Sequence, residues 1–138
     1  MNKKIIWIID DDAIYQTIIN KLIQKSGVFS THSSFMNGKE AIVSLNTILD
    51  INEEYIPDII LLDINMPIMD GWEFMEEIKR IKSKINKQII IYIVSSSIAI
   101  EDRNKSKTFT DIIGYIPKPI SVKDLIAIVQ SDENSIGN

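Results

Sequence analysis

Carboxylates end two apolar stretches that lie far apart in the chain. An early apolar run ends at Asp10, Asp11 and Asp12, and the run Ile59–Leu62 ends at Asp63, which opens the string DINMPIMDG. If both runs are strands of one sheet, the carboxylates meet, and bare carboxylates about 4 Å apart repel by roughly 4 kcal/mol at an effective dielectric near 20. A divalent cation removes that repulsion, so we expect one shared cation site.

Magnesium is the cation that these residues favour. It is hard, takes oxygen ligands and is commonly held by one or two carboxylates together with water and phosphate oxygens. An aspartate beside such an ion can also accept a phosphoryl group. A different role for the same residues is that each aspartate caps the helix that follows its strand. Taken singly, the two motifs leave both interpretations open.

The composition is that of one compact domain and excludes several classes of function. The chain has 138 residues, of which 45% are hydrophobic and 25% are charged, as in an ordinary globular domain. Its net charge of −4 argues against direct binding of nucleic acid, which needs a basic surface. Because the sequence has no cysteine, disulfides, zinc-thiolate sites and thiol catalysis are excluded.

The N-terminal segment predicts neither export nor membrane insertion. Met1–Ile9 contains two lysines and then only five apolar residues before the aspartates. This run is too short for a secretory signal and far too short to span a bilayer. We therefore expect a cytoplasmic protein.

Short apolar runs alternate with segments of helical period along the chain, which is typical of a parallel α/β sheet. The expected strands are Ile5–Ile9, Val28–Phe35, Asp58–Leu62, Gln88–Val94 and Asp111–Pro117. The expected helices cover approximately 15–23, 39–49, 74–81, 98–110 and 122–129. The domain is expected to comprise residues 1–131, followed by a polar tail, 132–138, and the chain is expected to fray from Ser131 onward.

The ends of the strands are expected to line one crevice. Pro117 has no N–H and is tolerated mainly at a sheet edge, which places the fifth strand outermost. Open parallel sheets bind ligands beyond the carboxyl ends of their strands. The residues that end the strands here are Asp10 and Asp11 (first), Asp63 (third), Ser95 (fourth) and Lys118 (fifth).

Over nearly all of Lys4–Val129 the chain resembles the receiver domains of two-component response regulators. The resemblance rests on features that occur in order along the sequence: an acidic pair closing the first strand, Asp63 with DINMPIMDG, a hydroxyl residue ending the fourth strand, and Lys118–Pro119 after the fifth. It implies an α/β fold, a parallel sheet of the flavodoxin-like doubly wound order 2-1-3-4-5 with helices on both faces.

The resemblance also implies a role for each matching acidic residue. Asp63 is the implied acceptor of a phosphoryl group from a phosphohistidine or a small acyl phosphate. Asp10 and Asp11 are the implied Mg²⁺-binding pair, with Asp11 the more direct ligand and Asp10 acting partly through water. Asn65 is implied to ligate the metal through its backbone carbonyl. Asp12 matches no role in the family, and we expect it to cap the first helix.

Three more residues match the family pattern. Lys118 is the implied lysine that contacts the acceptor and then a phosphoryl oxygen, and its bond to Pro119 is a candidate cis peptide. Ser95 is the implied switch hydroxyl, and the alternation of side chains along the strand then turns Ser96 away. Tyr115 is the implied aromatic residue that rotates inward as the hydroxyl moves. The alternative is that Tyr115 is a half-buried tyrosine on an edge strand.

The sequence departs from the family pattern in two places. Thr110–Ile113 stands where many members carry a small Gly-Ala step. Between Ser97 and Phe109, charged residues replace much of the usual apolar stripe: Glu101, Asp102, Arg103, Lys105 and Lys107. We therefore expect the fourth helix to be short, displaced or mobile.

These features predict a stand-alone, phosphorylation-dependent switch, not an enzyme, that relays its phosphoryl group or binds a downstream protein. The expected donor is a sensor histidine kinase or a histidine phosphotransfer protein. One rival is a phosphatase or phosphotransferase with an aspartate nucleophile, because Asp10–Asp12 resembles an Asp-x-Asp motif, although Ile14 stands where such enzymes usually carry Thr or Val. The other is a flavodoxin-like flavin binder, whose phosphate the acidic cluster would repel.

Overall fold

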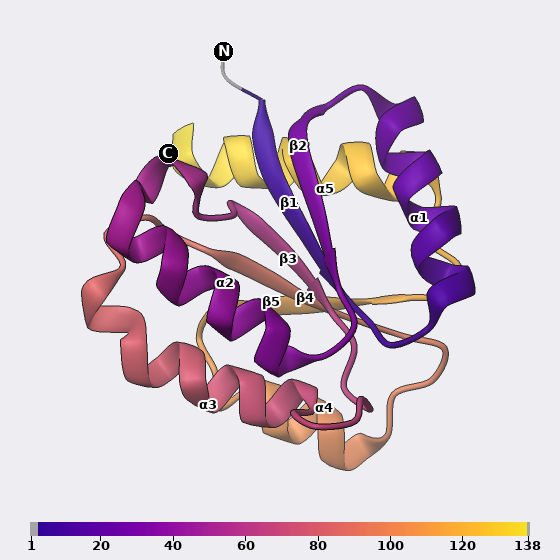
Figure 1. Ribbon diagram of the computed structural model, residues 1–138. Helices are drawn as coiled ribbons and strands as arrows, with labels where there is room; N and C mark the ends of the chain where they lie inside the picture. The colour runs from indigo at the N-terminus through magenta and orange to yellow at the C-terminus, as the bar shows by residue number, and fades with distance from the viewer. Residues whose placement is uncertain (1–2, 138) are drawn as a thin grey trace.

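The protein is a doubly wound sheet of parallel strands in the order β2-β1-β3-β4-β5 (Figure 1). The computed structural model describes residues 3–137, with side chains as far as Ser131. The strands are β1 (Lys4–Ile9), β2 (Phe29–Phe35), β3 (Ile59–Leu62), β4 (Ile90–Ser95) and β5 (Ile112–Pro117). The expected strand order is confirmed, and β5 with its Pro117 forms one edge of the sheet.

Helices connect the strands and cover both faces of the sheet. They are α1 (Ala13–Ser26), α2 (Gly38–Ile51), α3 (Gly71–Ile81), α4 (Ile100–Ser106) and α5 (Val122–Gly137), with short 3₁₀ turns η1 (Glu53–Tyr55) and η2 (Lys82–Lys84). None of the described helices is both long and apolar enough to cross a membrane.

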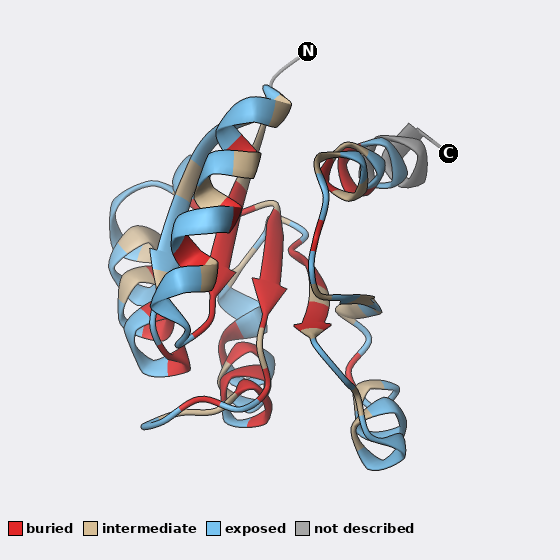
Figure 2. Ribbon diagram, turned by 90° about the vertical axis from the view of Figure 1, so that its right-hand side faces the viewer, coloured by how far each residue is buried: buried red, intermediate tan, exposed pale blue. Residues whose placement is uncertain are grey.

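The core consists of two apolar layers, one on each face of the sheet. Along β1, Ile6 and Ile8 face the layer under α1 and α5, whereas Trp7 and Ile9 face the layer under α2 and α3. This alternation is the geometry of a strand, and both sets are buried because a parallel sheet is covered on both sides. Figure 2 shows the buried residues concentrated in the central strands and on the inner sides of the helices.

The ends of the helices follow the local sequence. Asp12 caps α1, as expected, because its side chain accepts hydrogen bonds from the backbone N–H groups of the first turn. Gly27 ends α1 in the left-handed conformation with φ 68°, which glycine adopts without steric cost. Asp70 and Glu73 form a capping box that begins α3.

Two helices differ from the sequence pattern in length. The fourth is short, as expected: α4 has 7 residues, and none of them is buried. The fraying expected from Ser131 onward is wrong, because α5 continues to Gly137. The segment after Ser131 is polar but contains no glycine or proline before Gly137, so nothing in it interrupts the helix. Asn138 lies outside the described residues.

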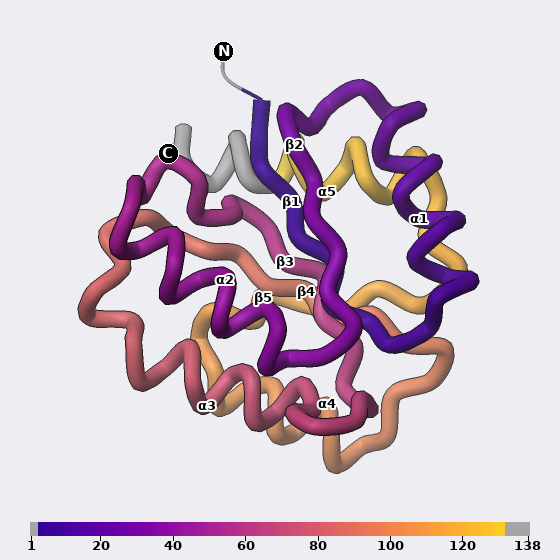
Figure 3. The backbone as a smooth tube through the Cα atoms, viewed as in Figure 1, coloured from indigo at the N-terminus to yellow at the C-terminus, as the bar shows by residue number. Residues whose placement is uncertain are grey.

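The carboxyl ends of the strands all lie on one side of the molecule. Figure 3 shows the chain leaving β1, β3, β4 and β5 on that side. The register places Ile9 beside Leu62, and Ser95 beside Pro117. The residues that follow these positions are therefore brought to one edge of the sheet.

Candidate functional site

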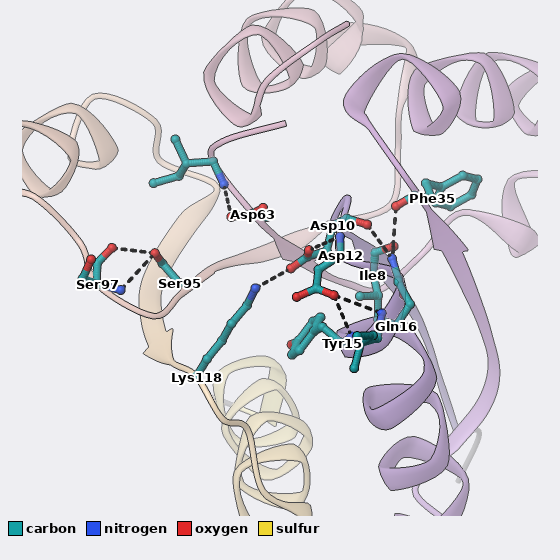
Figure 4. Close-up of polar contacts among 12 residues, drawn as sticks. Ile8, Asp10, Asp12, Tyr15, Gln16, Phe35, Asp63, Ser95, Ser97 and Lys118 are labelled. Carbon is teal, nitrogen blue, oxygen red and sulfur yellow. Dashed lines mark hydrogen bonds and ion pairs between the residues drawn. The ribbon is translucent and has the colours of Figure 1, made fainter. Parts of the chain in front are cut away.

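An acidic cluster lies beyond the ends of β1 and β3. Asp10, Asp11 and Asp63 each present a carboxylate oxygen, and these oxygens lie within 4.8 Å of one another. Asp10 is 1% exposed, Asp63 is half-buried and Asp11 is exposed. Figure 4 shows the Lys118 side chain extending from the end of β5 toward Asp10, with Asp63 beyond the end of β3. The structure thus brings together the carboxylates that the sequence predicted to meet.

The backbone around Asp10 is fixed by a buried glutamine, Gln16, that the sequence pattern did not indicate as part of the site. The amide nitrogen of Gln16, which is 6% exposed, donates to the carbonyl oxygens of Asp10 at 3.0 Å and Phe35 at 3.1 Å. The Asp10 N–H donates to the Phe35 carbonyl at 3.0 Å. Gln16 therefore joins the ends of β1 and β2. Its signal in the sequence is a polar side chain on the buried stripe that Ile19 and Ile23 define.

Asp63 is held by backbone contacts on both sides. Its N–H donates to the Ile9 carbonyl at 2.9 Å, and its Oδ1 accepts a hydrogen bond from the Ile64 N–H at 2.9 Å. Gly71 donates to the Ile64 carbonyl at 2.8 Å, and a Cβ atom at Gly71 would meet the Asp63 carbonyl oxygen at 2.6 Å. Only glycine lets the start of α3 approach the acceptor loop so closely.

The surroundings of Asp63 disfavour the ionised form of its carboxylate. Burial, and next the charge of Asp10, raise the pKa of Asp63 to about 6, although Lys118 and the Ile64 N–H act in the opposite direction. Burial also raises the pKa of the nearby Tyr15 hydroxyl, with Asp10 and Asp63 adding to the effect. Excess negative charge at this position attracts a cation.

Lys118 pairs with a different carboxylate from the one expected. Its Nζ lies 2.8 Å from Asp10 Oδ2 and 4.2 Å from the centroid of the Tyr15 ring, whereas the family pattern implies a contact with Asp63. The physical reason is burial: Asp10 is the most buried carboxylate of the cluster, and a buried charge needs a counterion most. The Lys118–Pro119 bond is cis, as expected.

The residues of the cluster fit a magnesium ion. All the donors are oxygens, which Mg²⁺ prefers. Asp10 Oδ2 is buried and accepts no hydrogen bond from the described residues, so that a metal would compete there only with the Lys118 ammonium. Asn65 lies two residues beyond Asp63 and is exposed. The Asp12 side chain caps α1, whereas Asp10, Asp11 and Asp63 form the acidic cluster. Helix capping and cation binding, the two roles considered for these aspartates, therefore concern different residues.

Ser95 and Tyr115 border a hollow of about 270 Å³ between β5 and the loop after β4. The Ser95 hydroxyl donates to the Ser97 carbonyl at 2.5 Å, and Figure 4 shows this pair apart from Asp63 and Lys118. The Tyr115 side chain is 43% exposed, and the Arg103 guanidinium lies 4.7 Å from the centroid of its ring. In this state the tyrosine is turned outward.

A tryptophan connects α4 to the start of α3. The Trp72 indole N–H donates to Asp102 Oδ1 at 3.1 Å, the Lys105 ammonium lies 5.4 Å from the centroid of the Trp72 ring, and Phe109 stacks on it with ring centroids 6.0 Å apart. Trp72 lies in the first turn of α3. Its contacts with α4 could not be predicted from the sequence, because their partners lie 30 or more residues away.

The family model for the response regulator receiver domain matches residues 6–130. The chemotaxis protein CheY of Halobacterium salinarum is 30% identical over 129 residues, which cover 91% of this chain and 96% of that protein. The transcriptional regulator NtrC of Salmonella typhimurium is 28% identical over 130 residues, covering 94% of this chain. The chain spans 25% of the length of NtrC.

Solved structures agree with these matches. A two-component response regulator from Cytophaga hutchinsonii superimposes with a TM-score of 0.85 and 26% identity, covering 97% of this chain and 99% of that one. The receiver domain of the Pseudomonas aeruginosa sensor histidine kinase PA1611, described with a magnesium ion in its active-site cleft, has the same fold with a TM-score of 0.71 at 21% identity, covering 94% of this chain and 96% of that one.

Proposed function

Since the chain belongs to the response regulator receiver domain family of two-component signalling, we propose that Asp63 accepts a phosphoryl group from a phosphohistidine with the help of Mg²⁺. The observation that carries this proposal is the convergence of Asp10, Asp11 and Asp63 within 4.8 Å. In the transfer, a carboxylate oxygen of Asp63 forms a bond to phosphorus and the bond from phosphorus to the histidine nitrogen breaks. The product is an acyl phosphate on Asp63 and a free histidine.

Magnesium binding is a property of the family, and Asp10, Asp11, Asp63 and the backbone carbonyl of Asn65 are the groups that would hold the ion here. When bound, the ion neutralises charge on the phosphoryl oxygens. The protein supplies the remaining compensation through Lys118, because a phosphorylated side chain carries about −1.5 to −2 charges at neutral pH. On phosphorylation Lys118 leaves Asp10 and binds a phosphoryl oxygen.

We propose a sensor histidine kinase or a histidine phosphotransfer protein as the donor. Exposed isoleucines follow both acidic segments in the chain: Ile14 and Ile18 on α1 are 75% and 53% exposed, and Ile68 in the loop after Asp63 is 75% exposed. Apolar side chains in such positions suit a protein partner that brings its histidine to the site. A relative of this chain, CheAY of Helicobacter pylori, is itself a sensor histidine kinase. We expect the transfer to take place in the cytoplasm.

Ser95 and Tyr115 are the residues that we expect to transmit the effect of phosphorylation from Asp63 to the protein surface. The phosphoryl oxygens recruit the Ser95 hydroxyl from the Ser97 carbonyl, and the hollow beside Ser95 gives the Tyr115 ring room to turn inward. The loop after β4 and α4 then change position and present a new surface to a downstream protein. The change is a shift between populated states, driven by the contacts that the phosphoryl group makes in each.

Labelling of the acceptor tests the proposal. Acetyl phosphate with Mg²⁺ should add one acid-stable, base-labile phosphoryl group, located at Asp63 by mass spectrometry. Asp63→Asn should abolish the label, whereas Asp70→Asn, which retains a side chain able to cap α3, should keep it. A label that survives Asp63→Asn at another residue would refute the assignment. Turnover of a generic phosphate ester would instead indicate an enzyme with an aspartate nucleophile.

A further inference from the structure

Lys118 is held on two sides, by the Asp10 carboxylate and by an aromatic ring. Its ammonium lies 2.8 Å from Asp10 Oδ2 and 4.2 Å from the centroid of the Tyr15 ring. Figure 4 shows the Tyr15 ring beside Lys118 at the start of α1. A cation within about 6 Å of the centre of an aromatic ring is attracted to its face. The tyrosine is therefore a second partner of the lysine.

Metal binding and phosphorylation affect the two contacts of the Lys118 ammonium differently. A metal ion at Asp10 competes with the ammonium for Oδ2, and a phosphoryl group at Asp63 attracts the ammonium away. The Tyr15 ring binds neither the metal nor the phosphate. It is packed against the core layer under α1 and α5, so its position is fixed independently of the acidic cluster.

We propose that Tyr15 is a positioning residue for Lys118, and that its ring is the surface on which the ammonium rests while it exchanges Asp10 for a phosphoryl oxygen. The inference builds on the proposed function of Asp63 as the phosphoryl acceptor. Without the ring, the flexible lysine stem would leave the ammonium unplaced once the metal occupies Asp10, and transfer to Asp63 would slow.

The ring, and not the hydroxyl, makes this contact. The Tyr15 hydroxyl oxygen is buried and forms no hydrogen bond with the described residues. A phenylalanine at this position would keep the aromatic face and lose only the hydroxyl, whereas leucine would keep apolar bulk and lose the face. These two substitutions separate positioning through the ring from the filling of space.

The test compares rates of Asp63 phosphorylation by acetyl phosphate at saturating Mg²⁺. Tyr15→Leu should slow the reaction roughly three- to tenfold, the range expected for a partly desolvated cation–aromatic contact. Tyr15→Phe should react at the wild-type rate. The control is Tyr55→Leu, since Tyr55 is 60% exposed in η1 and forms none of the cation–ring contacts found among the described residues. Its rate should not change.

A double-mutant cycle distinguishes positioning from a general structural effect. In a Lys118→Met background, Tyr15→Leu should cause no further loss of rate, because the group that Tyr15 positions is gone. The inference is overturned if Tyr15→Leu reacts as fast as the wild type, if Tyr15→Phe is as slow as Tyr15→Leu, or if the effect of Tyr15→Leu persists in the Lys118→Met background.

A second readout does not depend on phosphorylation. In NMR spectra of the unphosphorylated protein, the Lys118 side-chain protons next to the ammonium should be shifted upfield by the ring in the wild type and in Tyr15→Phe, and not in Tyr15→Leu. If these Lys118 protons have the chemical shifts of an ordinary lysine in the wild type, the contact with the Tyr15 ring does not form. If the shifts are present but the wild type is not labelled at Asp63, the proposed function fails, and the role of Tyr15 in transfer fails with it while the contact stands.

Discussion

The Lys118 ammonium lies 2.8 Å from Asp10 Oδ2 and forms its ion pair there, not with Asp63. Asp10 is a proposed metal ligand, so the lysine occupies one side of the site that a cation would use. The pairing compensates the most buried carboxylate in the absence of metal. It also means that metal binding must displace or weaken an ion pair already present in the protein.

Removing the lysine should therefore tighten magnesium binding. We expect Lys118→Met to lower the Kd for Mg²⁺ by at least about threefold, because a competing positive charge is lost at short range. The change is measured by titration of the amide NMR shifts of the loop after Asp63. The matched control is Lys87→Met, which removes an ion pair with Asp58 at 3.2 Å away from the cluster. A weaker or unchanged affinity in Lys118→Met would contradict the competition.

The exposed member of the acidic cluster should contribute strongly to metal affinity. Asp11→Asn removes one of three carboxylates whose oxygens lie within 4.8 Å, and we expect it to weaken Mg²⁺ binding roughly tenfold or more. Asp12→Asn is the control from the same acidic run, since asparagine can also cap α1. Equal titrations of Asp11→Asn and the wild type would remove Asp11 from the site.

The acceptor carboxylate should destabilise the metal-free protein at neutral pH. Its pKa is raised from 3.8 to about 6, so the folded state binds the proton more tightly than the unfolded state. The resulting cost is fully present above the folded pKa and disappears as the pH falls below the unfolded pKa. The full shift corresponds to about 3 kcal/mol, and solvent screening of this half-buried group reduces it to about 1 kcal/mol.

We therefore expect Asp63→Asn to increase the free energy of unfolding at pH 7 by about 1 kcal/mol. At a pH near 3.5 the difference should shrink, because Asp63 is then protonated in the folded state and mostly protonated in the unfolded state. Urea denaturation in the presence of EDTA measures both values. A stabilisation of the same size at both pH values would show that the charge of Asp63 is not its cause.

Much of the site could be predicted because it follows from strand order. Asp10, Asp63 and Lys118 each end or follow an apolar run, and a parallel sheet brings such ends together whatever the details of packing. The contacts of Lys118 could not be predicted in this way. They depend on which carboxylate is most buried and on the direction of the Tyr15 side chain, and both are results of tertiary packing.

The lengths of α4 and α5 also show what the sequence pattern can and cannot predict. The lack of apolar residues predicted that α4 is short, since a helix without a buried stripe has little to hold it. The end of α5 could not be predicted in this way, because a run of polar residues is compatible both with a frayed tail and with a helix. Hydrophobic period gives no indication of secondary structure where a segment has almost no apolar residues.

The loop after Asp63 contains a strained residue whose replacement should stabilise the protein. Ile68 has φ 70°, and a β-branched residue in the left-handed region costs about 1–2 kcal/mol. Its side chain is 75% exposed, so little packing is lost on substitution. We expect Ile68→Asn to raise the free energy of unfolding by about 0.5–1 kcal/mol, measured by urea denaturation.

The control for this prediction is an isoleucine with ordinary backbone geometry. Ile51 is 73% exposed at the end of α2 and is not among the described residues with positive φ. Ile51→Asn should bring no stabilisation. If Ile68→Asn is neutral or destabilising, the strain is compensated by contacts of the side chain.

The segment from Ser95 to Tyr115 should respond most to phosphorylation. It contains α4, which buries none of its residues. Individual side-chain contacts hold α4 in place, such as the Trp72–Asp102 hydrogen bond and the Arg103 guanidinium over the Tyr115 ring. Segments with few buried apolar contacts open at low free energy, so a small change at Ser95 can shift this one. With Mg²⁺ and beryllofluoride, a mimic of the phosphoryl group, amide hydrogen exchange should change in this segment and not in α2.

Arg103→Ala provides a second test of the same switch. The guanidinium holds the Tyr115 ring in its outward position, so its removal should shift the unphosphorylated protein toward the inward state. We expect the exchange pattern of Arg103→Ala without beryllofluoride to move part of the way toward that of the wild type with it. Equal exchange from Ser95 to Tyr115 with and without the mimic, despite confirmed occupancy at Asp63, would refute the switch and leave a passive phosphoryl carrier.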